Sequence, residues 1–187
     1  MCETFLIGEQ KIELTGYSWF GNNRKLISKR ACRGSGGVGI LISLDILKYF
    51  NVAVISDKFE GILWVQLVHK LNKYSLGICA YYLPPVGSSR GDYSQEFFDS
   101  LKSLIIDNYH VDDFLICGDF NARCGDLDDL GKPCDGVPSR MAIDTTVNQF
   151  GKELIFTLKS LDLCMLNGRS SPENDGFTSV SPHMVHQ

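Results

Sequence analysis

The sequence predicts a mixed α/β (α+β) protein, in which helices pack on a β-sheet. Three consecutive segments rich in β-branched and aromatic residues are separated by short polar turns, as is typical of an antiparallel sheet. A fourth apolar segment follows an amphipathic helical pattern, which gives a β–α–β order. With 187 residues, 44% hydrophobic and 21% charged, the chain is long enough for one globular domain with a substantial core.

The predicted strands are short and end at recognisable turns. A glycine-rich stretch, residues 34–39, leads into an apolar strand at Ile40–Ile42. The antiparallel strands are expected at Asn51–Ile55, Ile62–Val68 and Leu76–Leu83. The last of these ends before Pro84, because proline cannot donate a hydrogen bond to a sheet. The final strand is expected to be buried at Phe114–Cys117 and to be broken by Gly118.

Two helices are predicted from apolar residues at helical spacing. The first carries Phe97, Phe98, Leu101, Leu104 and Ile105. The second is expected to begin at a cap formed by Asp144 or Thr145, and its apolar stripe is Val147, Phe150, Leu154, Leu158 and Leu161. A strand at Leu163–Leu166 follows, and residues 181–187 are expected to form a flexible tail. The acidic, turn-rich stretch Asp126–Pro138 is expected to be a surface loop.

Composition and cysteine usage predict where the protein works. No apolar run approaches the ~20 residues that span a bilayer, so no membrane association is expected. The first ten residues lack the basic and then apolar pattern of a signal peptide. The seven cysteines are odd in number and include no CxxC pair, and several lie in apolar segments (Cys79, Cys117 and Cys164). Buried free thiols in an intracellular compartment, cytoplasmic or nuclear, are therefore expected.

The positions of three cysteines leave open a zinc site. Cys117, Cys124 and Cys134 could bind zinc together, although their spacing is not the usual one for such ligands.

A cationic segment follows the first aromatic residues of the chain. Residues 14–44 contain no Asp or Glu, and Trp19 and Phe20 precede a group of basic residues: Arg24, Lys25, Lys29, Arg30 and Arg33. Basic side chains beside aromatic ones suit contact with a nucleic-acid backbone and stacking on bases. The alternative is a solvated surface loop. The net charge of −4 argues against nucleic-acid binding by the whole surface.

Three polar residues cluster just after the last predicted strand, in the string FLICGDFNARCG at residues 114–125. Asp119, Asn121 and Arg123 lie within five positions of one another. Polar side chains at the end of a buried strand project from a rigid element into a loop, where functional sites are often built. An ordinary solvated turn is the alternative, because Gly-Asp and Asn are common turn residues.

This string resembles the GDFN motif of the endonuclease/exonuclease/phosphatase superfamily, which has the DNase-I-like fold. With Ala122 and Arg123 included, it is most similar to the apurinic-endonuclease-like domains of non-LTR retrotransposons. Other segments are similar in the same order along the chain. Cys2-Glu3-Thr4 resembles the end of the family's QET strand, and Tyr82 resembles the tyrosine of its Y-x-P motif. The region from Ser139 to Arg169 resembles the segment after GDFNAR, and residues 176–179 resemble a later strand.

The resemblance implies a two-layer β-sandwich with flanking helices, spanning residues 1–187, and a divalent-metal-dependent phosphodiesterase that cleaves DNA. Glu3 would bind Mg²⁺ or Mn²⁺, and Asp119 would orient or deprotonate the attacking water. Asn121 and Tyr82 would stabilise the pentavalent phosphorus. Substrate contacts would come from Arg123, Asn148, Asn167 and the cationic residues Arg24, Lys25, Lys29 and Arg30. The implied partner in a longer parent protein is a reverse transcriptase domain, and no oligomeric state is implied.

The resemblance also implies that the 187 residues form a domain that is incomplete at both ends. The family's first strand would precede Met1, and its closing S-x-x-D-Y and S-D-H motifs, with two Asp and the His, would follow Gln187. His183 and His186 do not match those motifs. Weak cleavage or none is therefore expected. Two alternatives remain: an inactive remnant that binds nucleic acid or protein, and a phosphatase acting on inositol phosphates or other small phosphoesters.

Overall fold

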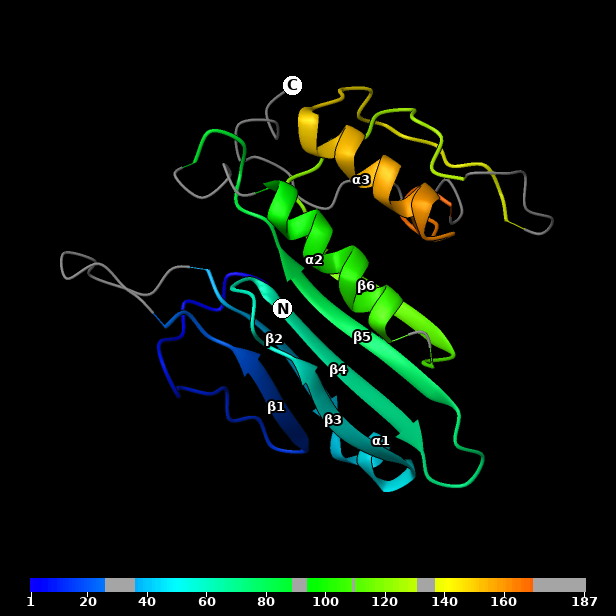
Figure 1. Ribbon diagram of the computed structural model, residues 1–187. Coiled ribbons are helices and arrows are strands. Elements are labelled where there is room, and N and C mark those ends of the chain that lie inside the picture. Colours follow the sequence, from blue (N-terminus) through cyan, green and yellow to red (C-terminus); the bar gives the residue numbers. More distant parts are fainter. Residues whose placement is uncertain (26–35, 89–93, 109, 131–136, 170–187) are drawn as a thin grey trace. The chain divides into compact units, whose positions relative to one another are not determined.

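A computed structural model of the chain describes residues 1–25, 36–88, 94–108, 110–130 and 137–169 (Figure 1). Residue contacts divide the chain into two compact units, Met1–Asn121 and Ala122–Gln187. Among the described residues, the first unit holds a two-stranded and a four-stranded sheet with two helices, and the second holds one helix. The predicted mixed α/β class, with two sheets and few helices, is therefore confirmed.

The four-stranded sheet contains the three predicted antiparallel strands and the strand of the GDFN string. Its strands, in spatial order, are β3 (Phe50–Ser56), β4 (Ile62–His69), β5 (Ser75–Tyr82) and β6 (Asp113–Asp119). β3, β4 and β5 pair antiparallel, whereas β6 pairs parallel to β5. A parallel pair needs a crossover connection, and α2 (Ser94–Asp107) lies in that connection. The predicted β–α–β order is thus confirmed.

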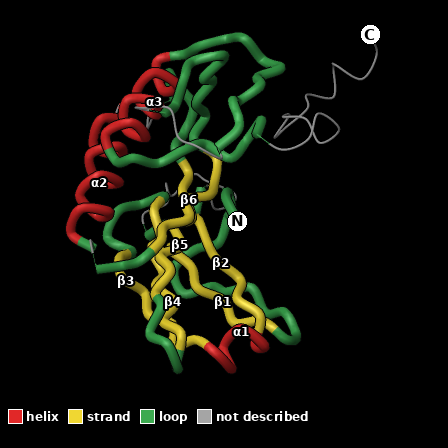
Figure 2. Tube along the Cα trace, turned by 90° about the vertical axis from the view of Figure 1, so that its right-hand side faces the viewer, coloured by secondary structure: helices red, strands yellow, loops and turns green. Residues whose placement is uncertain are grey.

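A two-stranded antiparallel sheet packs on one face of the larger sheet. It consists of β1 (Tyr17–Asn22) and β2 (Val38–Ser43). Val38 and Ile42 of β2 share a buried cluster with Leu63, Val65, Leu67 and Ala80 of β4 and β5. The short helix α1 (Leu44–Tyr49) follows directly, with the Ser43 side chain accepting a hydrogen bond from the Asp45 N–H. Figure 2 shows these two strands on one side of β4 and β5 and α2 on the other.

The opposite face of the large sheet is covered by α2. Side chains alternate between faces along a strand, so Trp64 and Tyr81 point away from the cluster that contains Leu63 and Val65. Tyr81 meets Phe97 of α2 edge-to-face, with ring centroids 5.6 Å apart. Phe97, Phe98 and Leu101 of α2 are buried, as the helical spacing of these residues predicted. Both faces of β4 and β5 are therefore packed, which explains why their sequences are almost continuously apolar.

The prediction for the last strand was wrong in two respects. β6 does not stop at Gly118 but continues in register with β5 to Asp119, which pairs with Tyr82. The strand is also not buried: Leu115 is 41% exposed, and the Cys117 side chain is exposed as well. The reason is that β6 is an edge strand of the described sheet. Of the thiols expected to be buried, Cys79 is buried, whereas Cys164 is partly exposed.

In the second unit, the helix begins later than predicted. α3 spans Gln149–Ser160, and its N-cap is Asn148, not Asp144 or Thr145. The Asn148 Oδ1 atom accepts a hydrogen bond from the Gly151 N–H at 2.8 Å. Asp144 instead accepts one from the Thr146 N–H, in a local turn that ends before the helix.

The predicted strand at Leu163–Leu166 is not formed, and the acidic stretch is not wholly at the surface. Asp129 is only 1% exposed. Its carboxylate accepts hydrogen bonds from the Met165 N–H and from Arg169, and the Arg140 guanidinium lies 3.8 Å away. The backbone of the expected strand therefore bonds to a side chain rather than to a neighbouring strand.

Several predicted features lie outside the described residues: Lys29, Arg30, Arg33, Cys134, the strand at 176–179, His183, His186 and the tail 181–187. In the part of the chain that the structure describes, no helix is both long and apolar enough to cross a membrane.

One buried side chain ties the two sheets of the first unit together. Asn22, at the end of β1, is 5% exposed. Its Nδ2 atom donates to the carbonyl oxygens of Asp57, Phe59 and Ile62 at 2.9, 2.9 and 2.8 Å. These bonds fix the connection between β3 and β4.

Replacing Asn22 by alanine is expected to lower the free energy of unfolding by about 1–3 kcal/mol, because buried carbonyl groups lose their donor. Urea denaturation followed by circular dichroism measures this loss. Asn51→Ala is the control, since Asn51 is exposed in β3. Equal losses in the two variants would contradict the role given to Asn22.

Candidate functional site

Two of the predicted catalytic residues meet where the parallel strands end. Tyr82 is the last residue of β5 and Asp119 is the last residue of β6, and the two occupy paired positions in the ladder. The carboxyl ends of neighbouring parallel strands lie at one edge of a sheet, a common place for functional side chains. The Leu83 N–H donates to the Asp119 carbonyl oxygen at 2.9 Å and extends this pairing by one residue.

The N-terminal segment brings Glu3 to the same place. The Tyr82 hydroxyl donates a hydrogen bond of 2.8 Å to Glu3 Oε1, across 79 positions of sequence. The segment is held on β2, because the Met1 amino group donates to the Gly39 carbonyl and Cys2 pairs with Val38 in an isolated bridge. The predicted ligand and the predicted tyrosine are thus in direct contact.

Asn121 is placed by the turn that follows β6. Its N–H donates to Asp119 Oδ1 at 2.9 Å, and its Nδ2 atom donates to the Leu83 carbonyl at 2.7 Å. Asn121 has a φ of +46°, a left-handed conformation that Asn tolerates better than most residues. The amide therefore fixes the turn that follows Asp119 against the end of β5.

The surroundings of Tyr82 keep its hydroxyl protonated. Burial raises the pKa of Tyr82 most, the hydrogen bond to Glu3 raises it further, and the charges of Glu3 and Asp119 add to the effect. Both carboxylates thus raise the pKa of the same hydroxyl. Tyr82 can therefore serve as a neutral hydrogen-bond donor, and it is not suited to act as a base.

The donor set suits a divalent cation that keeps part of its water shell. Glu3 and Asp119 supply carboxylate oxygens, the ligands that Mg²⁺ and Mn²⁺ prefer. Mg²⁺ commonly uses one or two carboxylates and retains several waters. Among the residues that the structure describes, no group of three or more His, Cys, Asp or Glu side chains could hold a metal ion.

Cys2 is a contact residue that the sequence did not single out. Its Sγ atom donates to the Tyr81 carbonyl at 3.3 Å. Burial raises the pKa of Cys2, and a hydrogen bond from the Asp119 N–H partly offsets this. The thiol thus fastens the segment that carries Glu3 to the ends of β5 and β6. The only sequence signal for Cys2 was its place beside Glu3 in the string that resembles the QET strand.

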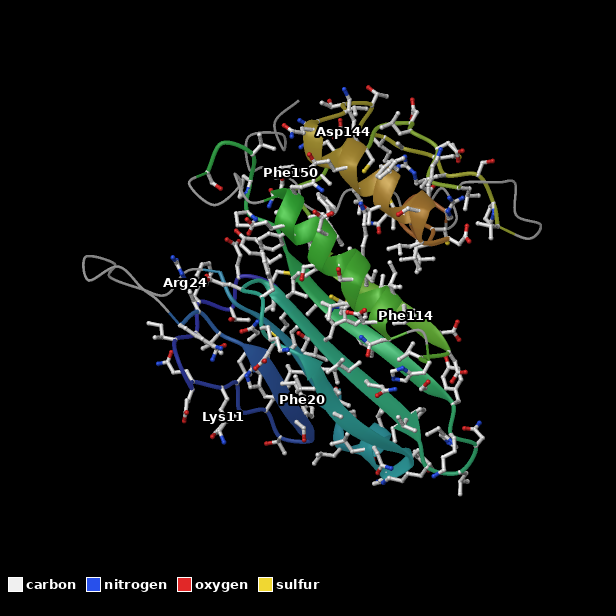
Figure 3. The ribbon with its side chains drawn as sticks, viewed as in Figure 1. Lys11, Phe20, Arg24, Phe114, Asp144 and Phe150 are labelled. Carbon is white, nitrogen blue, oxygen red and sulfur yellow. The ribbon has the colours of Figure 1, made fainter. Side chains whose placement is uncertain are left out.

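Two of the three predicted substrate contacts of the second unit, Arg123 and Asn148, have partners within that unit. Arg123 Nε lies 2.7 Å from Asp144 Oδ2 (Asp144 is labelled in Figure 3). This hydrogen bond from Arg123, together with hydrogen bonds to Thr146, lowers the pKa of Asp144 to about 2. Asn148 caps α3 and also accepts a bond from the Arg123 N–H at 3.0 Å. Asn167 is exposed in a turn.

The predicted cationic contacts of the first unit are described only in part. Arg24 Nε lies 3.0 Å from Glu60 Oε1, and the Arg24 side chain is 20% exposed. Lys25 is exposed. An arginine already paired with a carboxylate is a weaker candidate for phosphate contact than the exposed lysine.

No protein-family model matches the chain, and no curated protein matches it either. A functional interpretation therefore depends on two things: the motif resemblance of the sequence and the geometry around Tyr82.

Proposed function

We propose that the first unit carries the phosphate-hydrolysing site of a divalent-metal-dependent phosphodiesterase with DNA as its substrate. The observation that carries the proposal is the convergence of Glu3, Tyr82 and Asp119. Glu3 and Tyr82 share a hydrogen bond of 2.8 Å, and Tyr82 pairs with Asp119 in the ladder. These are residues for which the motif resemblance implies roles at one phosphate. A retrotransposon-type endonuclease of the DNase-I-like superfamily is the family we propose.

Each residue then has a role that suits its chemistry. Glu3 would hold Mg²⁺ or Mn²⁺, which when bound neutralises the charge that develops on the phosphate oxygens. The Asp119 carboxylate accepts hydrogen bonds and so can orient the attacking water and take up its proton. Tyr82 would turn its single hydroxyl hydrogen from Glu3 Oε1 to a phosphate oxygen once Glu3 holds the ion. Asn121 holds the turn that follows Asp119 through its bond to the Leu83 carbonyl.

DNA is the proposed substrate because of sequence features outside these four residues. Ala122 and Arg123 extend the GDFN string in the manner of the retrotransposon endonucleases. The cationic segment after β1 would add contacts to the phosphate backbone, with Lys25 as its exposed described member.

The test is nicking of supercoiled plasmid by the purified chain in Mg²⁺. We expect slow nicking that EDTA abolishes and that Asp119→Asn lowers at least about 100-fold, because general-base catalysis typically contributes this much. Asp113→Asn is the matched control: Asp113 begins the same strand, at its other end, and accepts a bond from the Tyr74 hydroxyl. It should nick like the unmodified chain.

Three outcomes would count against the proposal. A folded chain that binds DNA in a salt-sensitive way without metal-dependent nicking would support the inactive binding remnant. Hydrolysis of inositol phosphates or other small phosphoesters, without nicking, would support a phosphatase. Equal nicking by Asp119→Asn and Asp113→Asn would show that the observed cleavage does not come from this site.

A further inference from the structure

The outer face of the β1–β2 sheet carries an aromatic surface that the site around Tyr82 does not use. Phe20 and Ile40 pack against the buried cluster shared with the large sheet. Because side chains alternate along a strand, Trp19 on β1 points the other way, as do Gly21 and Gly39. Gly21 and Gly39 are direct partners in the ladder.

The Trp19 indole lies flat across these two glycines. A Cβ atom added at Gly39 would lie 1.9 Å from Trp19 Cη2, and one added at Gly21 would lie 2.6 Å from Trp19 Nε1. These two ring atoms belong to different parts of the indole, and the two glycines belong to neighbouring strands. The ring therefore spans both strands parallel to the sheet. One face of the ring covers the glycines, and the other points away from the sheet. Trp19 is partly exposed.

The indole borders an open depression of about 610 Å³ along β1, which Lys11, Glu13, Leu14 and Tyr17 also line. Tyr17 is 46% exposed and Leu14 is 50% exposed. Figure 3 shows Lys11 and Phe20 in this part of the first unit. A depression with two aromatic side chains and a polar rim suits a planar ring that carries hydrogen-bonding groups.

The charge of the surrounding sequence favours an anionic ligand. Residues 14–44 contain no Asp or Glu, and the segment joining β1 to β2 begins with Arg24 and the exposed Lys25. At the depression itself Lys11 and Glu13 lie 3.8 Å apart and offset each other's charge, so the positive excess comes from the residues that follow β1. Planar rings attached to a negatively charged backbone are the defining chemistry of a single-stranded nucleic acid.

We propose that Trp19 is a stacking platform for an unpaired base of single-stranded DNA, separate from the site around Tyr82. The choice of DNA rather than another nucleic acid rests on the proposed function. The base would stack on the open face of the indole, beside Tyr17, while Lys25, the exposed cationic residue described after β1, contacts the backbone. Because every base has an aromatic face, the platform would bind without sequence preference.

The two tryptophans of the chain make the platform directly observable. Trp64 is fully buried, so Trp19 is the tryptophan that a bound base can contact. We expect a strand of twelve thymidines, added in EDTA, to quench the tryptophan fluorescence. A strand of the same length and charge with abasic sites should bind about 5- to 150-fold more weakly, since stacking contributes about 1–3 kcal/mol per base.

Two variants and one control test the assignment. Trp19→Leu should remove both the quenching and the preference for thymidines over abasic sites. Gly39→Ala should do the same while keeping the tryptophan, because the added Cβ displaces the ring. Tyr49→Leu is the control, since Tyr49 is 60% exposed on α1. Equal binding of the two strands by the unmodified chain, or unchanged fluorescence, would overturn the proposal.

The result can be separated from that of the nicking experiment. The quenching is measured in EDTA, where the proposed metal-dependent cleavage cannot occur. Stacking without nicking would therefore refute the phosphodiesterase alone, and nicking without stacking would refute the platform alone.

Discussion

Replacing Gly118 by alanine is expected to lower the free energy of unfolding by about 3–6 kcal/mol, from backbone strain and steric overlap together. A Cβ atom at this position would lie 1.8 Å from the Tyr81 carbonyl oxygen and 2.7 Å from its carbon. Gly118 pairs with Tyr81 in the ladder, and its φ is +152°. Both contacts are with backbone, which cannot move aside as a flexible side chain can.

The consequence for function follows from the next residue. Asp119 pairs with Tyr82 only because β6 continues past Gly118 in register. If the added Cβ pushes β6 away from β5, Asp119 loses its place beside Tyr82. Under the proposed function, any Gly118→Ala chain that still folds should nick plasmid as poorly as Asp119→Asn.

Chemical denaturation of Gly118→Ala measures the loss of stability, and Gly87→Ala is the matched control. Gly87 also has a positive φ, +78°, but a Cβ there meets nothing within 4 Å. Gly87→Ala should therefore lower the free energy of unfolding only by the cost of a left-handed backbone at a residue with a side chain, about 1–2 kcal/mol. A loss for Gly118→Ala no larger than that of Gly87→Ala would show that the overlap with Tyr81 is relieved at little cost.

Replacing Asp129 by asparagine is expected to lower the free energy of unfolding of the second unit by about 3–5 kcal/mol, the usual cost of removing one partner from a buried ion pair. Asp129 is 1% exposed, and the side chains of Arg169 and Arg140 are 7% and 10% exposed. The carboxylate is 2.5 Å from Arg169 Nη2. A neutral amide would leave two nearly buried guanidinium groups without their counter-charge.

A weaker helical signal in circular dichroism and faster proteolysis within residues 122–169 would report this change. Asp128→Asn is the control, because Asp128 is mostly exposed and lies 3.5 Å from Lys159. A surface pair of this kind contributes about 0–1 kcal/mol. Similar losses in the two variants would mean that Asp129 is no more important than its neighbour.

The same carboxylate predicts a dependence on pH. Burial raises the pKa of Asp129, but the hydrogen bonds from the Met165 N–H and Arg169 lower it more, so the net value is below the usual 3.8. A group whose pKa is lower in the folded state stabilises the fold above its unfolded-state pKa. Its contribution is lost as the pH falls below about 3.8. Melting curves of Asp129→Asn should lack this part of the acid sensitivity, and identical acid sensitivity in both chains would contradict the assignment.

Local patterns in the sequence were sufficient to predict the main elements of the first unit. β3, β4 and β5 were predicted because runs of β-branched and aromatic residues alternate with polar turns. α2 was predicted because Phe97, Leu101 and Ile105 recur at helical spacing, and these residues are buried. The strand before Asp119 was predicted from its apolar residues, although its edge position and exposure were not.

The second unit was harder to predict, because each of its local cues has several equivalent readings. Asp144, Thr145 and Asn148 are all good helix caps, and only the packed backbone shows that Asn148 makes the bond. Asp129 is one of four aspartates between residues 126 and 135. Its burial depends on Arg140 and Arg169, which are distant in sequence.

The sequence by itself thus determined the class of the fold, the four strands of its larger sheet and the polar residues at and after the end of β6. Only the tertiary structure decided that Glu3 reaches the Tyr82 hydroxyl, that β6 runs on through Gly118, and that Trp19 lies on Gly21 and Gly39. The physical reason is range. Hydrophobic periodicity is a property of neighbouring residues, whereas a hydrogen bond across 79 positions depends on how the whole sheet is paired.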